Sequence, residues 1–184
     1  MVFDTETTGL DTKTDDVVQM AGVRILRNHI LVEDEFETLV APRRKIPPSS
    51  TKIHGITDDM VIGAPHFPEA VRGFLDYVDD AVVVAHNAGF DMAFVNREAG
   101  EACQNHNDRV LCTAQLSQAL DPQINDHTLD AIALRYGVEI DEARRHTALG
   151  DAYMTAKVFQ KMLPMLEDRE ITTLEHVLEF QGTR

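Results

Sequence analysis

The chain has 184 residues, of which 31 are acidic and 17 basic, so its formal net charge is −14. A chain of this length suits one domain and can bury about 70% of its unfolded surface without disulfides or metals. Apolar residues spread along the whole chain exclude disorder throughout, and no apolar run approaches the roughly 20 residues that span a bilayer. The charge argues at first sight against a nucleic-acid partner, because an acidic protein repels phosphate unless cations intervene.

The start of the chain and its cysteines predict the compartment. The first six residues lack the basic segment of a signal peptide and include a carboxylate at Asp4. The two cysteines, Cys103 and Cys112, are too few for a disulfide framework. We therefore expect a cytoplasmic protein with no membrane partner, in which Cys112 is a small buried residue rather than a reactive thiol.

The first half of the chain predicts a meander of strands followed by helices. Short apolar segments predict strands over residues 2–6, 17–26 and 30–40, with a turn at Asn28-His29 and a loop over 46–50. Pro68 suits the first turn of a helix over 68–78. The continuous apolar run 81–85 is typical of a buried strand, and a helix is expected over about 89–99.

The second half of the chain alternates strand and helix signals. We expect a polar loop at 104–108, a strand over 110–112, and helices over about 113–120, 128–136 and 147–166. Gly137 suits the left-handed end of the second of these helices, and Thr172 with Glu175 has the spacing of a capping box for a last one. A meander followed by this alternation predicts an α/β domain with a mixed sheet.

Three clusters of polar residues could carry chemistry. Asp4 and Glu6 point to the same side of the first strand, because side chains alternate along a strand. Asp91 closely follows the buried strand, at an edge of the sheet where ligands bind in α/β folds. His146 and Asp151 converge only if the histidine lies in the loop before the last long helix. Taken singly, each has an ordinary interpretation as a surface acid, a helix-capping acid or a solvated histidine.

Four motifs in order resemble the DnaQ-like 3′→5′ exonucleases of the DEDDh type, and above all the branch of the proofreading epsilon subunit of bacterial DNA polymerase III. The motifs are Val2-Phe-Asp-Thr-Glu-Thr-Thr-Gly-Leu10, Ile53-His-Gly-Ile-Thr57, Val84-Ala-His-Asn-Ala-Gly-Phe-Asp91 and His146-Thr-Ala-Leu-Gly-Asp151. The resemblance covers essentially the whole chain. It implies a ribonuclease H-like mixed β-sheet flanked by helices, in one exonuclease domain over 1–184 that could be excised from a longer chain.

The resemblance also implies the catalytic residues. Four acids would bind two divalent cations, Mg²⁺ or Mn²⁺, and His146 would act as general base; the acids are Asp4, Glu6, Asp91 and Asp151. Physical chemistry agrees, because carboxylates gathered in one cleft raise one another's pKa values unless positive charge is supplied. Oxygen ligands also suit hard cations of this kind.

Further residues are implied as substrate contacts or as supports. Those expected to hold the terminal nucleotide are Thr7, Thr8, Gly9, Leu10 and His54. Asn87 would brace its loop by hydrogen bonds. Phe90 would stack or wedge against the substrate, and packing in the core explains this residue at least as well. His86 and Asp130 are interpreted as supports, and one of Arg144 and Arg145 as a contact to the nucleic-acid backbone. Gln19 and Cys112 depart from the family pattern, where many relatives have Glu and Asp.

The resulting hypothesis is a metal-dependent 3′→5′ exonuclease that acts on a single-stranded or frayed 3′ end of DNA and releases nucleoside 5′-monophosphates. A DNA polymerase subunit is an expected partner. Three alternatives stay open: a polymerase-independent DEDDh exonuclease acting on RNA or short oligonucleotides, a nucleic-acid-binding module that has lost catalysis, and a phosphohydrolase of small nucleotides. Bound cations would offset the negative charge, so the acidity of the chain would no longer argue against a nucleic-acid substrate. It would argue only against tight, non-specific binding of a duplex.

Overall fold

A computed structural model describes residues 1–99 and 109–182 of the chain, so the expected loop 104–108 and Cys103 lie outside the described residues. The described strands form one mixed sheet in the order β3-β2-β1-β4-β5. They are β1 (Val2–Thr7), β2 (Val17–Leu26), β3 (His29–Leu39), β4 (Val83–Ala85) and β5 (Val110–Cys112). The first three pair antiparallel, and β4 and β5 run parallel to β1. The expected mixed α/β sheet is confirmed.

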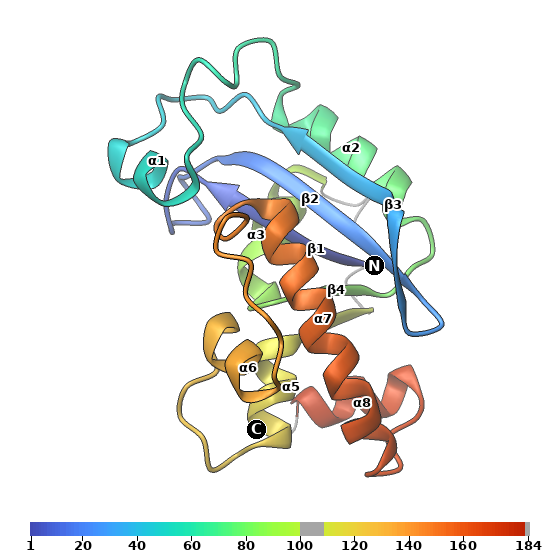
Figure 1. Cartoon of the computed structure of the whole chain (residues 1–184). Coiled ribbons are helices and arrows are strands. Elements are labelled where there is room, and N and C mark those ends of the chain that lie inside the picture. Colours follow the sequence, from blue (N-terminus) through green and yellow to red (C-terminus); the bar gives the residue numbers. More distant parts are fainter. Residues whose placement is uncertain (100–108, 183–184) are drawn as a thin grey trace.

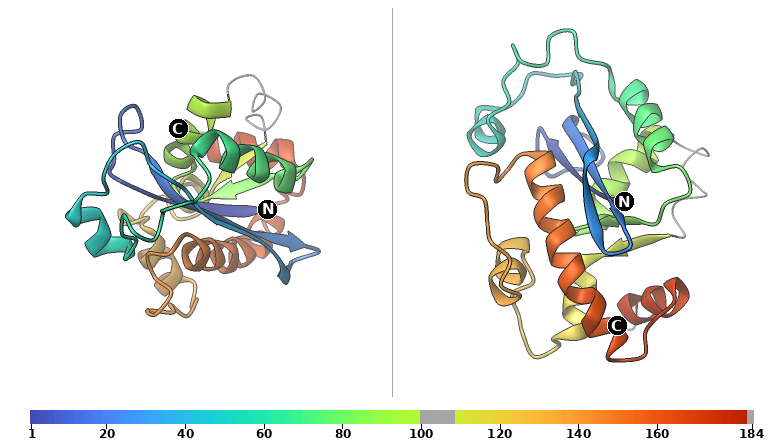
Figure 2. Two further views of the ribbon diagram at one scale, coloured as in Figure 1. Left: turned by 90° about the horizontal axis from the view of Figure 1, so that it is seen from above. Right: turned by 45° about the vertical axis from the view of Figure 1, so that its right-hand side comes forward.

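Helices cover both faces of the sheet (Figures 1 and 2). On one face lie α2 (Phe67–Val78) and α3 (Ala88–Ala99), and on the other α5 (Thr113–Leu120), α6 (Leu129–Arg135), α7 (Ala148–Glu167) and α8 (Leu174–Gly182). The short α1 (Pro48–His54) lies beyond one end of the sheet. In the described part of the chain, no helix is long and apolar enough to cross a membrane.

The alternation of side chains along β1 explains why two cores form. Phe3 packs on Phe74 of α2, with ring centroids 4.8 Å apart, in the core under α2 and α3. Its neighbour Val2 faces the opposite core, under α7. Successive residues of a strand point to opposite faces, so Asp4 and Glu6 are on the α7 side with Val2. The buried Cys112, at the end of β5, packs as expected into the first core.

Three local expectations are wrong: the position of a turn, the absence of a helix after residue 47, and the start of the last helix. The hairpin turn is Arg27-Asn28 rather than Asn28-His29; both residues have positive φ, 50° and 63°, as a two-residue turn that follows the strand twist requires. The segment expected as a loop over 46–50 already contains the start of α1 at Pro48, since proline suits a first helical turn.

The last helix begins one residue later than the capping-box pattern indicates. The hydroxyl of Thr173, not of Thr172, accepts the hydrogen bond from the His176 amide at 3.2 Å. Glu175 therefore does not occupy the position from which a capping box closes. Gly137 does have the left-handed conformation expected after α6, with φ 65°.

Candidate active site

Three of the predicted acids meet where β1 and α7 pack together. Asp4 and Glu6 project from β1 toward α7, and Asp151 lies in the first turn of α7. One carboxylate oxygen from each of the three lies within 4.8 Å of the other two. Glu6 and Asp151, which are 145 positions apart in the sequence, thus lie close together. The N-terminus of α7 also favours the Asp151 carboxylate through the helix dipole.

The fourth acid approaches from the other side of the sheet. Asp91 lies in the first turn of α3, is 3% exposed and accepts a hydrogen bond of 2.5 Å from the Thr5 hydroxyl. Thr5 points away from Asp4 and Glu6, so Asp91 is anchored behind the three clustered carboxylates. Its charge still raises the pKa of both Asp4 and Glu6. The four acids therefore form one electrostatic unit.

Burial and mutual repulsion make these carboxylates weak acids in the absence of a cation. Burial, reinforced by the neighbouring carboxylates, raises the pKa of Asp4 well above its usual range and that of Glu6 to about 8. Burial likewise raises the pKa of Asp91 to about 7 and that of Asp151, although Arg145 works in the other direction at Asp151. The charged forms are penalised because water is excluded and like charges are close.

The donor atoms fit a hard divalent cation. All the clustered ligands are carboxylate oxygens, which Mg²⁺ and Mn²⁺ prefer. The Oδ1 atom of Asp151 is buried and has no hydrogen-bond partner among the described residues. A buried polar atom without a partner is costly, so this oxygen needs a ligand that the protein itself does not supply.

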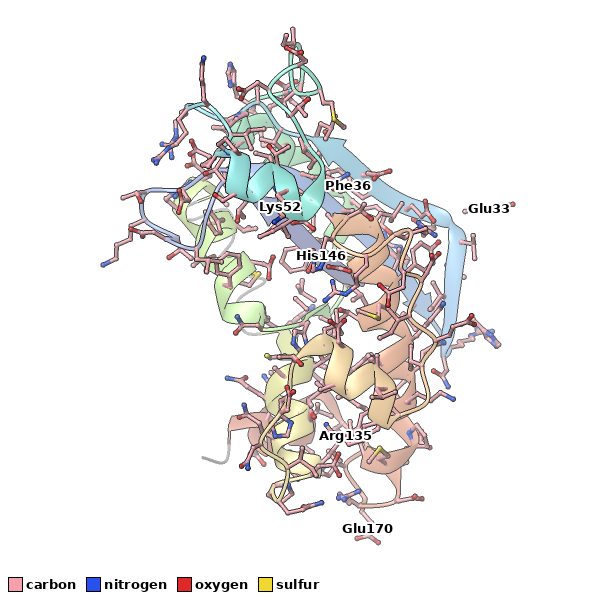
Figure 3. The ribbon with its side chains drawn as sticks, turned by 60° about the vertical axis from the view of Figure 1, so that its left-hand side comes forward. Glu33, Phe36, Lys52, Arg135, His146 and Glu170 are labelled. Atoms are coloured by element: carbon pink, nitrogen blue, oxygen red, sulfur yellow. The ribbon has the colours of Figure 1, made fainter. Side chains whose placement is uncertain are left out.

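His146 lies in the loop immediately before α7, as its convergence with Asp151 requires. Its backbone has φ 60°, an uncommon conformation for a residue with a side chain. Figure 3 shows His146 beside the start of α7, between α1 and α6. Together with Asp4, Asp151 and Arg145 it lines a cleft of about 510 Å³. An imidazole at this place has access to solvent and to the carboxylates.

Two residues hold that loop against the helix. The Thr147 hydroxyl accepts the Gly150 amide hydrogen bond at 3.1 Å and donates to the Arg144 carbonyl at 2.7 Å. A Cβ atom at Gly150 would overlap the same carbonyl oxygen, so glycine permits the close approach. The conformation of His146 is therefore set by the capping turn around it.

The two arginines before His146 have different surroundings. Arg145 turns inward, where its Nη1 pairs with Asp151 and its Nε donates to Asp130 at 2.7 Å. Arg144 is exposed and lies over the ring of Tyr153, 5.0 Å from the centroid. Of the two, only Arg144 does not pair with Asp130 or Asp151. Arg144 is therefore better placed for the expected contact to the nucleic-acid backbone.

Gln19 has a role that the sequence did not reveal. It pairs with Glu6 in the register of β1 and β2, and its Oε1 accepts the Ala148 amide hydrogen bond at 3.0 Å. Its Nε2 donates to Glu37 at 3.1 Å. Gln19 thus satisfies a free amide at the start of α7 and ties the Asp151 helix to the sheet. The only available signal was its place opposite Glu6, which becomes visible once the strands are paired.

Comparison with known proteins agrees with this geometry. Residues 1–159 match the RNase_T family, described as exonuclease. The chain belongs to the exonuclease family. It is 45% identical, over 97% of its length, to a DNA polymerase III subunit epsilon-like protein of Rhodobacter capsulatus, and 36% identical, over 96%, to a PolC-type DNA polymerase III of Caldanaerobacter subterraneus. It spans 25% and 12% of these relatives.

A solved exonuclease has the same fold. Exonuclease X, in complex with 5′ overhanging duplex DNA, superposes with a TM-score of 0.74 at 26% identity, over 98% of both chains. The expected ribonuclease H-like architecture and the resemblance to DEDDh exonucleases are thereby confirmed. The roles of individual site residues stay predictions.

The turn after the first exonuclease motif is tightly built. The Thr7 hydroxyl donates to the Gly9 carbonyl at 2.7 Å, and a Cβ at Gly9 would overlap the Asp15 carboxylate. The Thr8 side chain is buried and accepts the Asp16 amide hydrogen bond at 3.0 Å, so its hydroxyl shapes the turn rather than facing a ligand. Leu10, in contrast, is 86% exposed and is available for contact.

His54 lies beside this turn. It is buried at the end of α1, and its Nδ1 accepts the Ile56 amide hydrogen bond at 3.0 Å. Burial lowers the pKa of His54, while the Thr7 backbone acts in the opposite direction. The Ser50 hydroxyl of α1 donates to the Thr8 carbonyl at 2.7 Å. α1 is therefore attached to the first motif, which brings His54 to the predicted nucleotide position.

The second motif combines core and cleft residues. Phe90 packs edge-on against Phe94, 5.2 Å between centroids, so core packing accounts for it. Asn87 has φ 54° and braces the turn through its carbonyl, which accepts the Phe90 amide, while its side chain is exposed. The Nδ1 of His86 lies 3.0 Å from the Thr113 hydroxyl, and burial lowers the pKa of His86 to about 4. His86 is therefore neutral at pH 7, as its expected role as a support requires.

Proposed function

We propose that the chain is a metal-dependent 3′→5′ exonuclease that hydrolyses the terminal phosphodiester bond of DNA and releases nucleoside 5′-monophosphates. The observation that carries the proposal is the meeting of Asp4, Glu6 and Asp151 within 4.8 Å, in a cleft that His146 also lines. Membership of the exonuclease family supports the reaction class.

Each residue has a defined task in this proposal. Asp4, Glu6, Asp91 and Asp151 hold two divalent cations. When bound, such ions polarise the scissile phosphate and make a bound water more acidic. His146 takes the proton of the attacking water at a ring nitrogen, a role in which histidine is the commonest side chain. Thr7, Gly9, Leu10 and His54 surround the terminal nucleotide.

DNA is proposed as the substrate because of two relatives. Exonuclease X is described with a 5′ overhanging duplex DNA, and it covers this chain almost completely. The epsilon-like protein belongs, by its name, to a DNA polymerase III context, which also supports a polymerase subunit as partner. The acidic chain has little charge for gripping a duplex, so we propose a single-stranded or frayed 3′ end.

A direct assay tests this function. The purified chain is incubated with 5′-labelled single-stranded DNA, mismatched duplex DNA and RNA, each with Mg²⁺, Mn²⁺ or a chelator. We expect stepwise shortening of DNA from the 3′ end with metal, fastest for single-stranded or mismatched ends. Asp4→Asn is the variant control and should abolish shortening. The same rate for this variant, or faster hydrolysis of RNA than of DNA, would contradict the proposal.

A further inference from the structure

Arg145 is the cation that the fold itself supplies to the carboxylate cluster. Its Nη1 pairs with Asp151 Oδ2, its Nε lies 2.7 Å from Asp130 Oδ1, and its side chain is only 15% exposed. We propose that Arg145 competes with the divalent cations for Asp151, so that metal loading requires its guanidinium to withdraw. This inference rests on the proposed function, because it concerns the same metal site.

The competition follows from charge and distance. A cation bound to either oxygen of Asp151 shares that carboxylate with the guanidinium, and two positive charges on one carboxylate repel each other. Screening by water is weak here, since the side chain of Asp151 is 10% exposed. Arg145 also lowers the pKa of Asp4 and Glu6, so its field reaches the whole cluster. Its presence must therefore weaken metal binding.

The structure offers the withdrawn side chain another place. A second cavity, of about 240 Å³, adjoins the ion pair, since both Arg145 and Asp151 line it. Four acids line that cavity, namely Asp151 itself and three others, Glu35, Glu139 and Asp141, together with two further cations, Arg144 and Lys157. Asp130 is 54% exposed and stands outside the cluster, so it is left to water and not as a buried unpaired acid when the rigid guanidinium moves away. Withdrawal then exchanges one carboxylate partner for others and leaves no buried charge unpaired.

Arg144 provides a matched control. It is the adjacent residue, carries the same charge, and lies over the Tyr153 ring instead of pairing with a clustered acid. Replacing either arginine by glutamine changes the net charge by the same amount. A difference between the two variants therefore reports the specific contact with Asp151 and not the overall charge.

The experiment measures Mn²⁺ binding from the electron paramagnetic resonance signal of the free aquo ion, at pH 8 and low salt. We expect Arg145→Gln to lower the Mn²⁺ dissociation constant about fivefold or more, the factor for loss of one ion pair. Arg144→Gln and Arg145→Lys, which keep a cation at position 145, should stay near the wild-type value. Mn²⁺ should also raise the melting temperature of Arg145→Gln more than that of wild type.

Three results would overturn the inference. Equal dissociation constants for Arg145→Gln and Arg144→Gln would mean that the ion pair has no specific effect. Weaker binding by Arg145→Gln would mean that Arg145 orients Asp151 for the metal. Both results leave the exonuclease proposal standing. A wild-type protein whose Mn²⁺ binding is absent, or is unchanged by Asp151→Asn, would overturn this inference together with the metal site on which it rests.

Discussion

Metal binding at neutral pH should release protons from the carboxylate cluster. Metal ligands must be deprotonated, and the pKa values of Glu6 and Asp91 are raised to about 8 and about 7. At pH 7 such groups are about 90% and about half protonated, so loading the site should release about 1.4 protons from these two alone. The raised pKa of Asp4 adds to this number.

Isothermal titration calorimetry measures the release directly. Mn²⁺ is titrated into the protein at pH 7 in PIPES, MOPS and Tris, and the slope of the observed enthalpy against the ionisation enthalpy of the buffer gives the number of protons. We expect one to two protons at pH 7 and fewer at pH 9, because Glu6 and Asp91 are then already ionised. Glu6→Gln should release about one proton fewer. A slope of zero at pH 7, with Mn²⁺ still bound, would refute the assignment of these raised pKa values to the metal site.

Three further predictions concern the same region. The metal-free protein should lose on the order of 3 kcal/mol of stability between pH 5 and pH 8, since the folded pKa of Glu6, about 8, lies above its unfolded value and the native state therefore binds more protons in this window. Urea unfolding across this pH range measures the loss, and stability that rises with pH would contradict it. Thr147→Ala should destabilise the protein by about 1 kcal/mol through loss of the α7 cap, and Thr147→Ser should retain most of the wild-type stability. An unchanged urea midpoint for the alanine variant would show that the cap contributes nothing to stability. Gly150→Ala should lower kcat at least about tenfold with a smaller change in KM, because the added Cβ displaces the Arg144 carbonyl that fixes the His146 loop. Steady-state hydrolysis measures this effect, and a wild-type kcat in a folded variant would exclude this role of the loop.

Local patterns in the sequence were sufficient for most of the fold. The apolar run at 81–85, Pro68 and Gly137 each act within a few residues, so strand β4, helix α2 and the end of α6 could be predicted from them. The errors were a turn displaced by one residue at Arg27-Asn28, a helix cap displaced by one residue at Thr173, and one short helix, α1, that was not expected. They arise because the final register of a turn or cap is decided by pairing with distant segments, which local patterns do not contain.

The site was predictable only where chemistry and motif coincide. The family motifs pointed to the four acids, of which the fold brings Asp4, Glu6 and Asp151 together, and the alternation along β1 placed Asp4 and Glu6 on one face. Gln19 could not be found in this way, since its role depends on meeting Ala148, 129 residues later in the chain. Arg145 was considered, with Arg144, only as a contact to the nucleic-acid backbone, whereas the fold places it against Asp151. The first miss is a long-range contact, whereas the second spans only six residues and depends on the conformation of the loop before α7.

The acidity of the chain therefore has a local physical meaning. The clustered acids are destabilising when charged, and the fold limits that cost by raising their pKa values, by placing two helix N-termini beside them and by pairing one with Arg145. Each of these devices is weaker than a divalent cation with several oxygen ligands. A cation can thus replace both the protons and the guanidinium. Under the proposed function, the same replacement would convert a surface that repels phosphate into one that attracts it.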